Sequence, residues 1–230
     1  MRIASIIDIS LVDVPGIPVT VIFTGGCNFD CPYCQNADII PLDSGTEMSV
    51  EEIVENSIGN LVDGFCVTGG EPTIHQDLPD LLKALKSTGL HVNLNTQGSI
   101  PSILEKCLPF LDSVWFDIKA PPAIYTRVSR TIANPWSRVL DSMNLLISSD
   151  VEFWPRTTFT GSLLSSDDIR DIVHELDKLG FSGEYLVQNY VASSGVRQSE
   201  KSYLKASDIS ELEAATHDWS DRIEVRLEWR

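Results

Sequence analysis

Hydrophobic residues along this chain fall into two alternating kinds of segment, short runs rich in β-branched residues and longer stretches of helical period. The short runs predict strands at residues 19–24, 64–68, 91–96, 114–119, 152–159, 185–191 and 223–228. In the longer stretches, apolar residues recur at i, i+3 and i+4, a spacing that places them on one face of a helix. Strand and helix therefore alternate along most of the chain.

Four of the longer stretches predict well-marked helices. Ser49 and Glu52 have the spacing of a capping box, and the helix that they open is expected to run to about Val62, before Gly64. Two of the other three helices are expected to stop at Gly89 and Gly180. The apolar stripes of these three are Leu78, Leu81, Leu82 and Leu85; Val139, Leu140, Met143, Leu146 and Ile147; and Ile169, Ile172, Val173, Leu176 and Leu179.

This alternation predicts an α/β fold with a mostly parallel sheet and right-handed crossover connections. The pattern repeats without a change of composition, which indicates an open or complete barrel forming a single domain over residues 1–230. Active sites of such barrels are built at the carboxyl ends of the strands. Residues at those ends are therefore the first candidates for function.

Polar residues stand at the carboxyl ends of most of the predicted strands. The first strand runs into a loop with three cysteines. The polar residues of the next five ends are Thr68, Glu71 and Thr73; Asn95, Thr96 and Gln97; Asp117 and Lys119; Arg156 and Thr158; and Gln188 and Asn189. A single polar strand end is expected because strand ends face solvent. Six polar ends that meet on one rim of the sheet indicate a functional site.

Composition and charge narrow the choice of partners and compartment. The formal charge of −16 disfavours nucleic acid, whose binding proteins normally present a basic surface. No apolar run approaches the ~18 residues that a membrane span needs, and no leader sequence is evident, so we expect a cytoplasmic protein with no membrane partner. An odd number of cysteines, five, fits a reducing compartment and metal chemistry better than disulfides.

Cys27, Cys31 and Cys34 give one loop three thiolates and no fourth. Closed zinc sites and ordinary iron–sulfur clusters both use four protein ligands. A zinc site would have to borrow its fourth ligand from Cys66, Cys107, His75, His91, His174 or His217. Neither of the two further cysteines is paired at zinc-like spacing. The alternative is a four-iron cluster with one iron left open for a small molecule.

Two motifs now resemble a known family. The run Cys27-Asn28-Phe29-Asp30-Cys31-Pro32-Tyr33-Cys34, followed after the next predicted strand by Gly69-Gly70-Glu71-Pro72, resembles the signature of the radical S-adenosylmethionine (SAM) superfamily. The resemblance covers most of the chain and implies a partial (β/α)6 barrel. It also implies that the three cysteines hold a [4Fe-4S] cluster whose fourth iron is chelated by SAM.

The resemblance extends to roles for residues at the other strand ends. Gly69, Gly70 and Glu71 would meet the SAM amino group, since a backbone without a Cβ can approach a ligand closely. Tyr33 would pack near the adenine, with Gln188 also on the cofactor. Asn95 and Arg156 would contact the methionine carboxylate or the ribose, with Asp117 as the other natural partner for Arg156.

The same resemblance implies the chemistry. A reduced cluster would pass one electron to the sulfonium of SAM, giving methionine and a 5′-deoxyadenosyl radical that takes hydrogen from a substrate. The flanking residues 10–16 and 23–27, together with Gln35 and Asn36, resemble the activating enzymes of glycyl radical enzymes, in particular that of the anaerobic ribonucleoside-triphosphate reductase. In some of these, the residue corresponding to Asp117 helps to bind a monovalent cation.

A glycyl radical enzyme would then be the protein substrate, and a flavodoxin or ferredoxin would be the electron donor. One alternative is a small-molecule enzyme similar to the 7-carboxy-7-deazaguanine synthases. Those typically show Trp-Cys-Asp in the cysteine loop, where this chain has Tyr33, Cys34 and Gln35. A non-catalytic metal or electron-transfer protein is another alternative, but it leaves the Gly-Gly-Glu-Pro segment and the polar rim unexplained.

Overall fold

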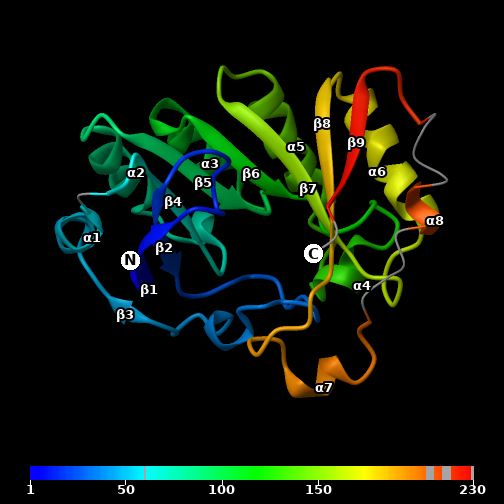
Figure 1. Cartoon of the computed structure of the whole chain (residues 1–230), viewed down its shortest axis with the longest axis horizontal. Coiled ribbons are helices and arrows are strands. Elements are labelled where there is room, and N and C mark those ends of the chain that lie inside the picture. Colours follow the sequence, from blue (N-terminus) through cyan, green and yellow to red (C-terminus); the bar gives the residue numbers. More distant parts are fainter. Residues whose placement is uncertain (60, 206–209, 214–218, 229–230) are drawn as a thin grey trace.

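The computed structural model describes residues 1–59, 61–205, 210–213 and 219–228. One nine-stranded sheet has the order β3-β1-β2-β4-β5-β6-β7-β8-β9 and does not close into a barrel (Figure 1). Seven strands run parallel: β2 (Val19–Thr24), β4 (Gly64–Gly69), β5 (His91–Thr96), β6 (Ser113–Asp117), β7 (Glu152–Phe159), β8 (Gly183–Asn189) and β9 (Ile223–Glu228). The predicted α/β class and the open, mostly parallel sheet are confirmed.

Helices connect and cover the strands. They are α1 (Val50–Ser57), α2 (Leu78–Lys86), α3 (Pro101–Cys107), α4 (Tyr125–Ser129), α5 (Trp136–Ile147), α6 (Ser166–Lys178), α7 (Gln198–Lys201) and α8 (Ser210–Glu213). The predicted apolar stripes of α2, α5 and α6 pack against outward-facing residues of the sheet, such as Phe65, Leu94 and Phe116, in one large core. No helix in the described ranges is long and apolar enough to cross a membrane.

A second, smaller cluster lies on the opposite face of the sheet. Val19 and Val21 of β2 pack there against Cys66 of β4 and Val14, with Trp154 of β7 beside them. Because side chains alternate along a strand, the residues at these inner positions lead up to the polar residues at the carboxyl ends. The small cluster is therefore the floor beneath those ends.

Some predicted boundaries are wrong. The capping box at Ser49 and Glu52 forms as expected, but α1 ends at Ser57, where Ile58 takes an extended backbone before Gly59. The strands predicted at 114–119 and 185–191 end at Asp117 and Asn189. The sequence pattern also missed β1 (Arg2–Ser10), which pairs antiparallel with β2, and the short β3 (Thr46–Glu47) beside it. Shifts of register along β1 blur its alternation.

Candidate active site

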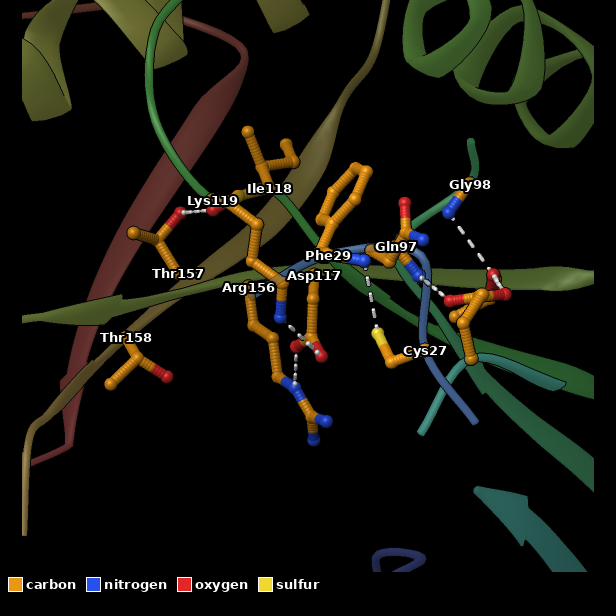
Figure 2. Close-up of polar contacts among 12 residues, drawn as sticks. Cys27, Phe29, Gln97, Gly98, Asp117, Ile118, Lys119, Arg156, Thr157 and Thr158 are labelled. Atoms are coloured by element: carbon orange, nitrogen blue, oxygen red, sulfur yellow. Dashed lines mark hydrogen bonds and ion pairs between the residues drawn. The ribbon is translucent and has the colours of Figure 1, made fainter. Parts of the chain in front are cut away.

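The cysteine loop leaves β2 at Thr24 and is fixed by backbone hydrogen bonds. The Gly26 and Cys27 N–H groups donate to the carbonyls of Ile39 and Ile40 at 2.8 and 2.9 Å. Cys31 is buried, and Cys27 and Cys34 are partly exposed. The Phe29 N–H points at Cys27 Sγ, 3.4 Å away (Figure 2), an arrangement that stabilises a thiolate. The three cysteines of this loop line one cavity.

Burial keeps these thiols protonated in the absence of metal. It raises the pKa of Cys27 to about 12 and that of Cys31 to about 11, and it raises the pKa of Cys34 as well. The positive charge of Lys119 lowers all three pKa values, against the effect of burial. Thiolates are the metal-binding form, so iron binding must release these protons.

Gly69 and Gly70 press the loop after β4 directly against the cysteine loop. A Cβ on Gly70 would lie 1.9 Å from the Gly26 carbonyl oxygen, and one on Gly69 would lie 2.3 Å from the Thr24 nitrogen. The Gly70 and Glu71 N–H groups donate to the Thr24 and Gly26 carbonyls, both at 2.9 Å. These glycines are thus needed for contact between two loops, a reason that the sequence argument about ligand approach did not include.

The Glu71 carboxylate is occupied by four protein donors. One oxygen accepts from the Thr73 N–H and hydroxyl at 3.0 and 2.5 Å and from the Thr96 hydroxyl at 2.6 Å. The other accepts from the Gln97 N–H at 2.9 Å. Burial raises the pKa of Glu71, and these hydrogen bonds lower it in part. The side chain therefore ties the end of β5 to the loop after β4 and is taken up by the protein itself.

Asp117 lies between two cationic side chains (Figure 2). Its carboxylate accepts from Arg156 Nε at 2.5 Å and from Lys119 Nζ at 3.1 Å. The Arg156 guanidinium also lies 5.1 Å from the centre of the Trp115 ring. Burial raises the pKa of Asp117, but the two positive charges outweigh it and hold that pKa well below its usual range. Of the two partners considered for Arg156, the structure shows Asp117. A monovalent cation there would lie against two positive charges, so this arrangement does not favour one.

A cavity of about 440 Å³ brings the predicted site residues together. It lies at the carboxyl ends of the strands, where the cysteine loop meets the loop after β4. Every residue that the sequence singled out for the cluster or for SAM lines it: Cys27, Cys31, Tyr33, Cys34, Gly69, Gly70, Glu71, Asn95, Asp117, Arg156 and Gln188.

The other zinc-ligand candidates lie elsewhere. Cys66 is fully buried in the inner cluster, where its thiol donates to Asn93 Oδ1 at 3.4 Å. Cys107 is buried at the end of α3. His75 and His91 bond to Gly25 O and Ser113 Oγ, at 2.9 and 2.8 Å, and His174 lies on α6. His217 lies outside the described residues. Within the described chain, no three His, Cys, Asp or Glu side chains are arranged to hold a single metal ion.

One network of side-chain hydrogen bonds, which runs from the exposed Asn28 to the buried Gln97 and Ser99, was missed by the sequence reasoning. Gln97 Nε2 donates to Asn28 Oδ1 and to Ser99 Oγ, both at 2.9 Å, and Asn28 Nδ2 donates to Ser99 Oγ at 2.8 Å. Through the Gln97 N–H the network continues to Glu71. It therefore joins the cysteine loop, the end of β5 and the Gly-Gly-Glu turn. The polar run at the end of β5 was the only signal for it.

Comparison with known proteins identifies the family. The profile of the "Radical SAM superfamily" matches residues 21–179, which include the cysteine loop, the Gly-Gly-Glu turn, Asp117 and Arg156. The chain belongs to the radical SAM superfamily. Enzymes of this superfamily use a [4Fe-4S] cluster and SAM, so the prediction of both cofactors is confirmed.

Relatives of two kinds resemble the chain. A protein of Methanocaldococcus jannaschii named "Putative glycyl-radical enzyme activating enzyme" is 26% identical over 97% of this chain and 95% of its own length. The pyruvate formate-lyase-activating enzyme of Clostridium pasteurianum is 35% identical over 51% of this chain and 52% of its own. A 7-carboxy-7-deazaguanine synthase of Synechocystis is 36% identical over 34% of this chain and 36% of its own.

Solved structures share the fold. SuiB of Streptococcus suis bound to SAM superposes with a TM-score of 0.67 at 15% identity, over 88% of this chain and 48% of that one, so the chain spans about half of SuiB. QueE from Escherichia coli superposes with a TM-score of 0.57 at 17% identity, over 98% and 93% of the two chains.

The residues around the cavity fit the cofactors of the superfamily. Three cysteines of one loop supply three ligands and leave one iron of a four-iron cluster for another molecule. Asn95 Oδ1 is buried on the cavity wall with no hydrogen-bond partner in the described chain. An unpaired buried acceptor is costly, so a ligand donor fits there. The adjacent Arg156 and Lys119 place positive charge where a carboxylate can bind.

Proposed function

We propose that this enzyme installs a glycyl radical on a partner protein. The similarity to the M. jannaschii protein carries the proposal, because it extends over nearly the full length of both chains. It thus includes the segments outside the matched residues 21–179. The match to a pyruvate formate-lyase-activating enzyme over half the chain supports the same class of reaction.

The cofactors supply the chemistry, and the chain supplies ligands and orientation. Cys27, Cys31 and Cys34 would hold the cluster. When bound and reduced, the cluster supplies the electron that splits SAM into methionine and a 5′-deoxyadenosyl radical, which can take a hydrogen atom from glycine. The Gly69 to Glu71 backbone and Asn95 would orient SAM, and Tyr33 and Gln188 would contact its nucleoside.

Apolar residues of the cysteine loop would keep water from the site. Phe29 is 3% exposed, lines the cavity, and packs edge-on against the buried Tyr125 ring at 6.2 Å. Pro32 is also buried. On the opposite wall, Asp117 neutralises part of the charge of Arg156 and Lys119 and holds both side chains at the cavity. The site would thus be dry on the cysteine side and positively charged on the β6–β7 side.

A second candidate function is synthesis of a small deazaguanine-like product. Its support is the sequence similarity to several 7-carboxy-7-deazaguanine synthases, which are 32–37% identical where they match. The sequence similarity to 7-carboxy-7-deazaguanine synthases covers between 34% and 46% of this chain, whereas that to the M. jannaschii protein covers 97%. We therefore rank it second.

The test begins with protein reconstituted anaerobically with iron and sulfide. We expect about four irons per chain and, on reduction, release of 5′-deoxyadenosine from SAM. Adding a candidate glycyl radical enzyme should then produce a carbon-centred protein radical by electron spin resonance. A partner variant with alanine at its radical glycine is the matched control.

Two outcomes would contradict the proposal. Release of 5′-deoxyadenosine with no protein radical, but with turnover of a free pterin-like substrate, would favour the second candidate. A zinc-loaded protein that leaves SAM intact would exclude both candidate functions.

The partner that the sequence resemblance implies is an anaerobic ribonucleotide reductase, with a flavodoxin or ferredoxin as electron donor. The five free cysteines fit the reducing cytoplasm in which such partners work.

A further inference from the structure

A segment beyond the matched family region folds back onto the cysteine loop. Residues 191–204, which we call the strap, follow β8 and include α7. In Figure 1 this orange segment runs along the lower edge of the molecule and meets the blue segment that follows β2. The superfamily profile matches residues 21–179, so the strap lies outside the matched residues.

The strap contacts the cysteine loop through its backbone. Gln35 Nε2 donates to the Val191 carbonyl at 3.0 Å, and the Ala37 N–H donates to the Gly195 carbonyl at 3.2 Å. At Gly195 the two segments are so close that a Cβ would lie 1.7 Å from the Gln35 carbonyl oxygen. Gln35 directly follows Cys34, so this contact fixes the end of the loop that bears the third sulfur.

An ion pair adds a second attachment, at the middle of the cysteine loop. The Arg197 guanidinium of the strap pairs with the carboxylate of Asp30, the residue before Cys31. The Asp30 N–H donates to the Ser129 carbonyl at the end of α4, at 2.9 Å. Asp30 is therefore held between the strap and α4.

Arg130, the residue that follows α4, attaches α4 to the strap. Its guanidinium makes a bidentate pair with Glu200 of the strap at 2.6 and 2.8 Å, and Tyr203 donates to the same carboxylate at 2.5 Å. Arg130 has a φ of 52°, in the left-handed region that a residue with a Cβ rarely adopts. Arg130 is exposed, but the Glu200 carboxylate that it binds is buried, and this pair anchors the strap to α4.

We infer that the strap holds the cysteine loop in the shape that binds the cluster, with Arg197 as a positioning residue that acts through Asp30. Among the described residues, Arg197 forms an ion pair with Asp30 and not with a cysteine, although its charge lowers the pKa of Cys34. By restraining both Asp30 and Gln35, the strap fixes the spacing of Cys31 and Cys34. The inference rests on the cluster that the superfamily uses and not on the identity of the radical acceptor.

The test compares cluster retention in variants of the reconstituted holoenzyme. In Arg197→Ala, anaerobic transfer of iron to a chelator should become roughly fivefold faster, as expected for the loss of about 1 kcal/mol of restraint. The electron spin resonance spectrum of the reduced cluster should broaden, and Arg197→Lys should restore both properties in part. The control is Arg170→Ala, which breaks an exposed ion pair on α6 and should leave both unchanged.

Gly195→Ala gives a test that does not depend on charge. Its Cβ would push the strap from Gln35 and should also speed iron loss, whereas Gly59→Ala, at a site with no contact closer than 3.7 Å, should not. Wild-type iron retention and spectra in both Arg197→Ala and Gly195→Ala would overturn the inference. If instead retention changes as expected but no partner radical forms with the wild type, the activase proposal fails and the strap inference stands.

Discussion

At the scale of single residues, the carboxylates of Glu71 and Asp117 at the cavity are both held by donors of the protein itself. Glu71 is surrounded by hydrogen-bond donors, and Asp117 bridges Arg156 and Lys119. Polar side chains at strand ends could be recognised in the sequence, because parallel strands bring their carboxyl ends together. Which of them would turn toward the protein and which toward the cavity could not, since that depends on neighbours supplied by distant segments.

Glu71→Ala should lower the free energy of unfolding of the metal-free protein by about 2–4 kcal/mol, because it leaves the buried N–H groups of Thr73 and Gln97 without an acceptor. Urea unfolding measures this. Glu71→Gln keeps the shape of the side chain and should cost less. If either variant unfolds like the wild type yet no longer binds SAM, the carboxylate acts on the ligand directly and the structural role assigned here is wrong.

Asp117→Asn should destabilise the protein by about 2 kcal/mol at pH 7, because it removes the charged partner of two partly buried cations that lie side by side. The folded-state pKa of Asp117 lies below the unfolded value of about 3.9, so the stabilisation by its carboxylate is present above that value and is lost as the pH falls through the lowered folded pKa. The difference between wild type and variant should therefore shrink below about pH 4.

Urea unfolding at several pH values checks this prediction. Glu184→Gln, which breaks an exposed pair with Arg226, is the control and should cost less than about 1 kcal/mol. A difference between Asp117→Asn and wild type that stays constant from neutral to acid pH would mean that the lost stability does not come from the charge of Asp117.

At the scale of secondary-structure elements, the sequence pattern predicted the parallel strands, from the buried β5 to the partly exposed edge strand β9, better than the antiparallel strands β1 and β3. The strands at 91–96, 152–159 and 223–228 have the predicted bounds. β1 is exposed at Ile7 and Ile9 and carries register shifts, so its pattern is weak. The end of α1 was misplaced because Ile58 continues the apolar pattern while its backbone is already extended.

Gly70→Ala tests the contact between the two loops of the site. Its Cβ would lie 1.9 Å from the Gly26 carbonyl oxygen, so the Gly-Gly-Glu turn must move from the cysteine loop. We expect reconstituted iron to fall well below that of the wild type, with the circular dichroism of the fold retained. Gly59→Ala serves as control. Full iron content in Gly70→Ala would show that the two loops need not touch for the cluster to bind.

At the scale of the whole molecule, the cavity is a product of the sheet as a unit. Side chains from the ends of β4 to β9 line it together with the cysteine loop after β2. The sequence predicted most of this rim from strand ends. It did not predict Asn36, Val191 or Glu228 at the cavity, because their position depends on how the strap and the last strand fold back.

Because the strand ends that line the cavity come from most of the sheet, SAM should stabilise all of these strand ends and not the cysteine loop alone. At a SAM concentration 100 times its Kd, binding adds about 2.7 kcal/mol. For a chain of this size that should raise the Tm of the cluster-loaded protein by roughly 5–10 °C. Hydrogen exchange should slow at the carboxyl ends of β4, β5 and β7 and remain unchanged at their amino ends.

The metal-free protein is the matched control, since it lacks the open iron that SAM would chelate. There the same SAM concentration should give a much smaller shift of Tm and little protection. Equal protection in both forms would mean that strand-end residues such as Asn95 and Arg156 bind SAM without the cluster. Protection confined to the cysteine loop would mean that the polar rim contributes nothing to SAM binding, and its residues would then have to serve the protein substrate.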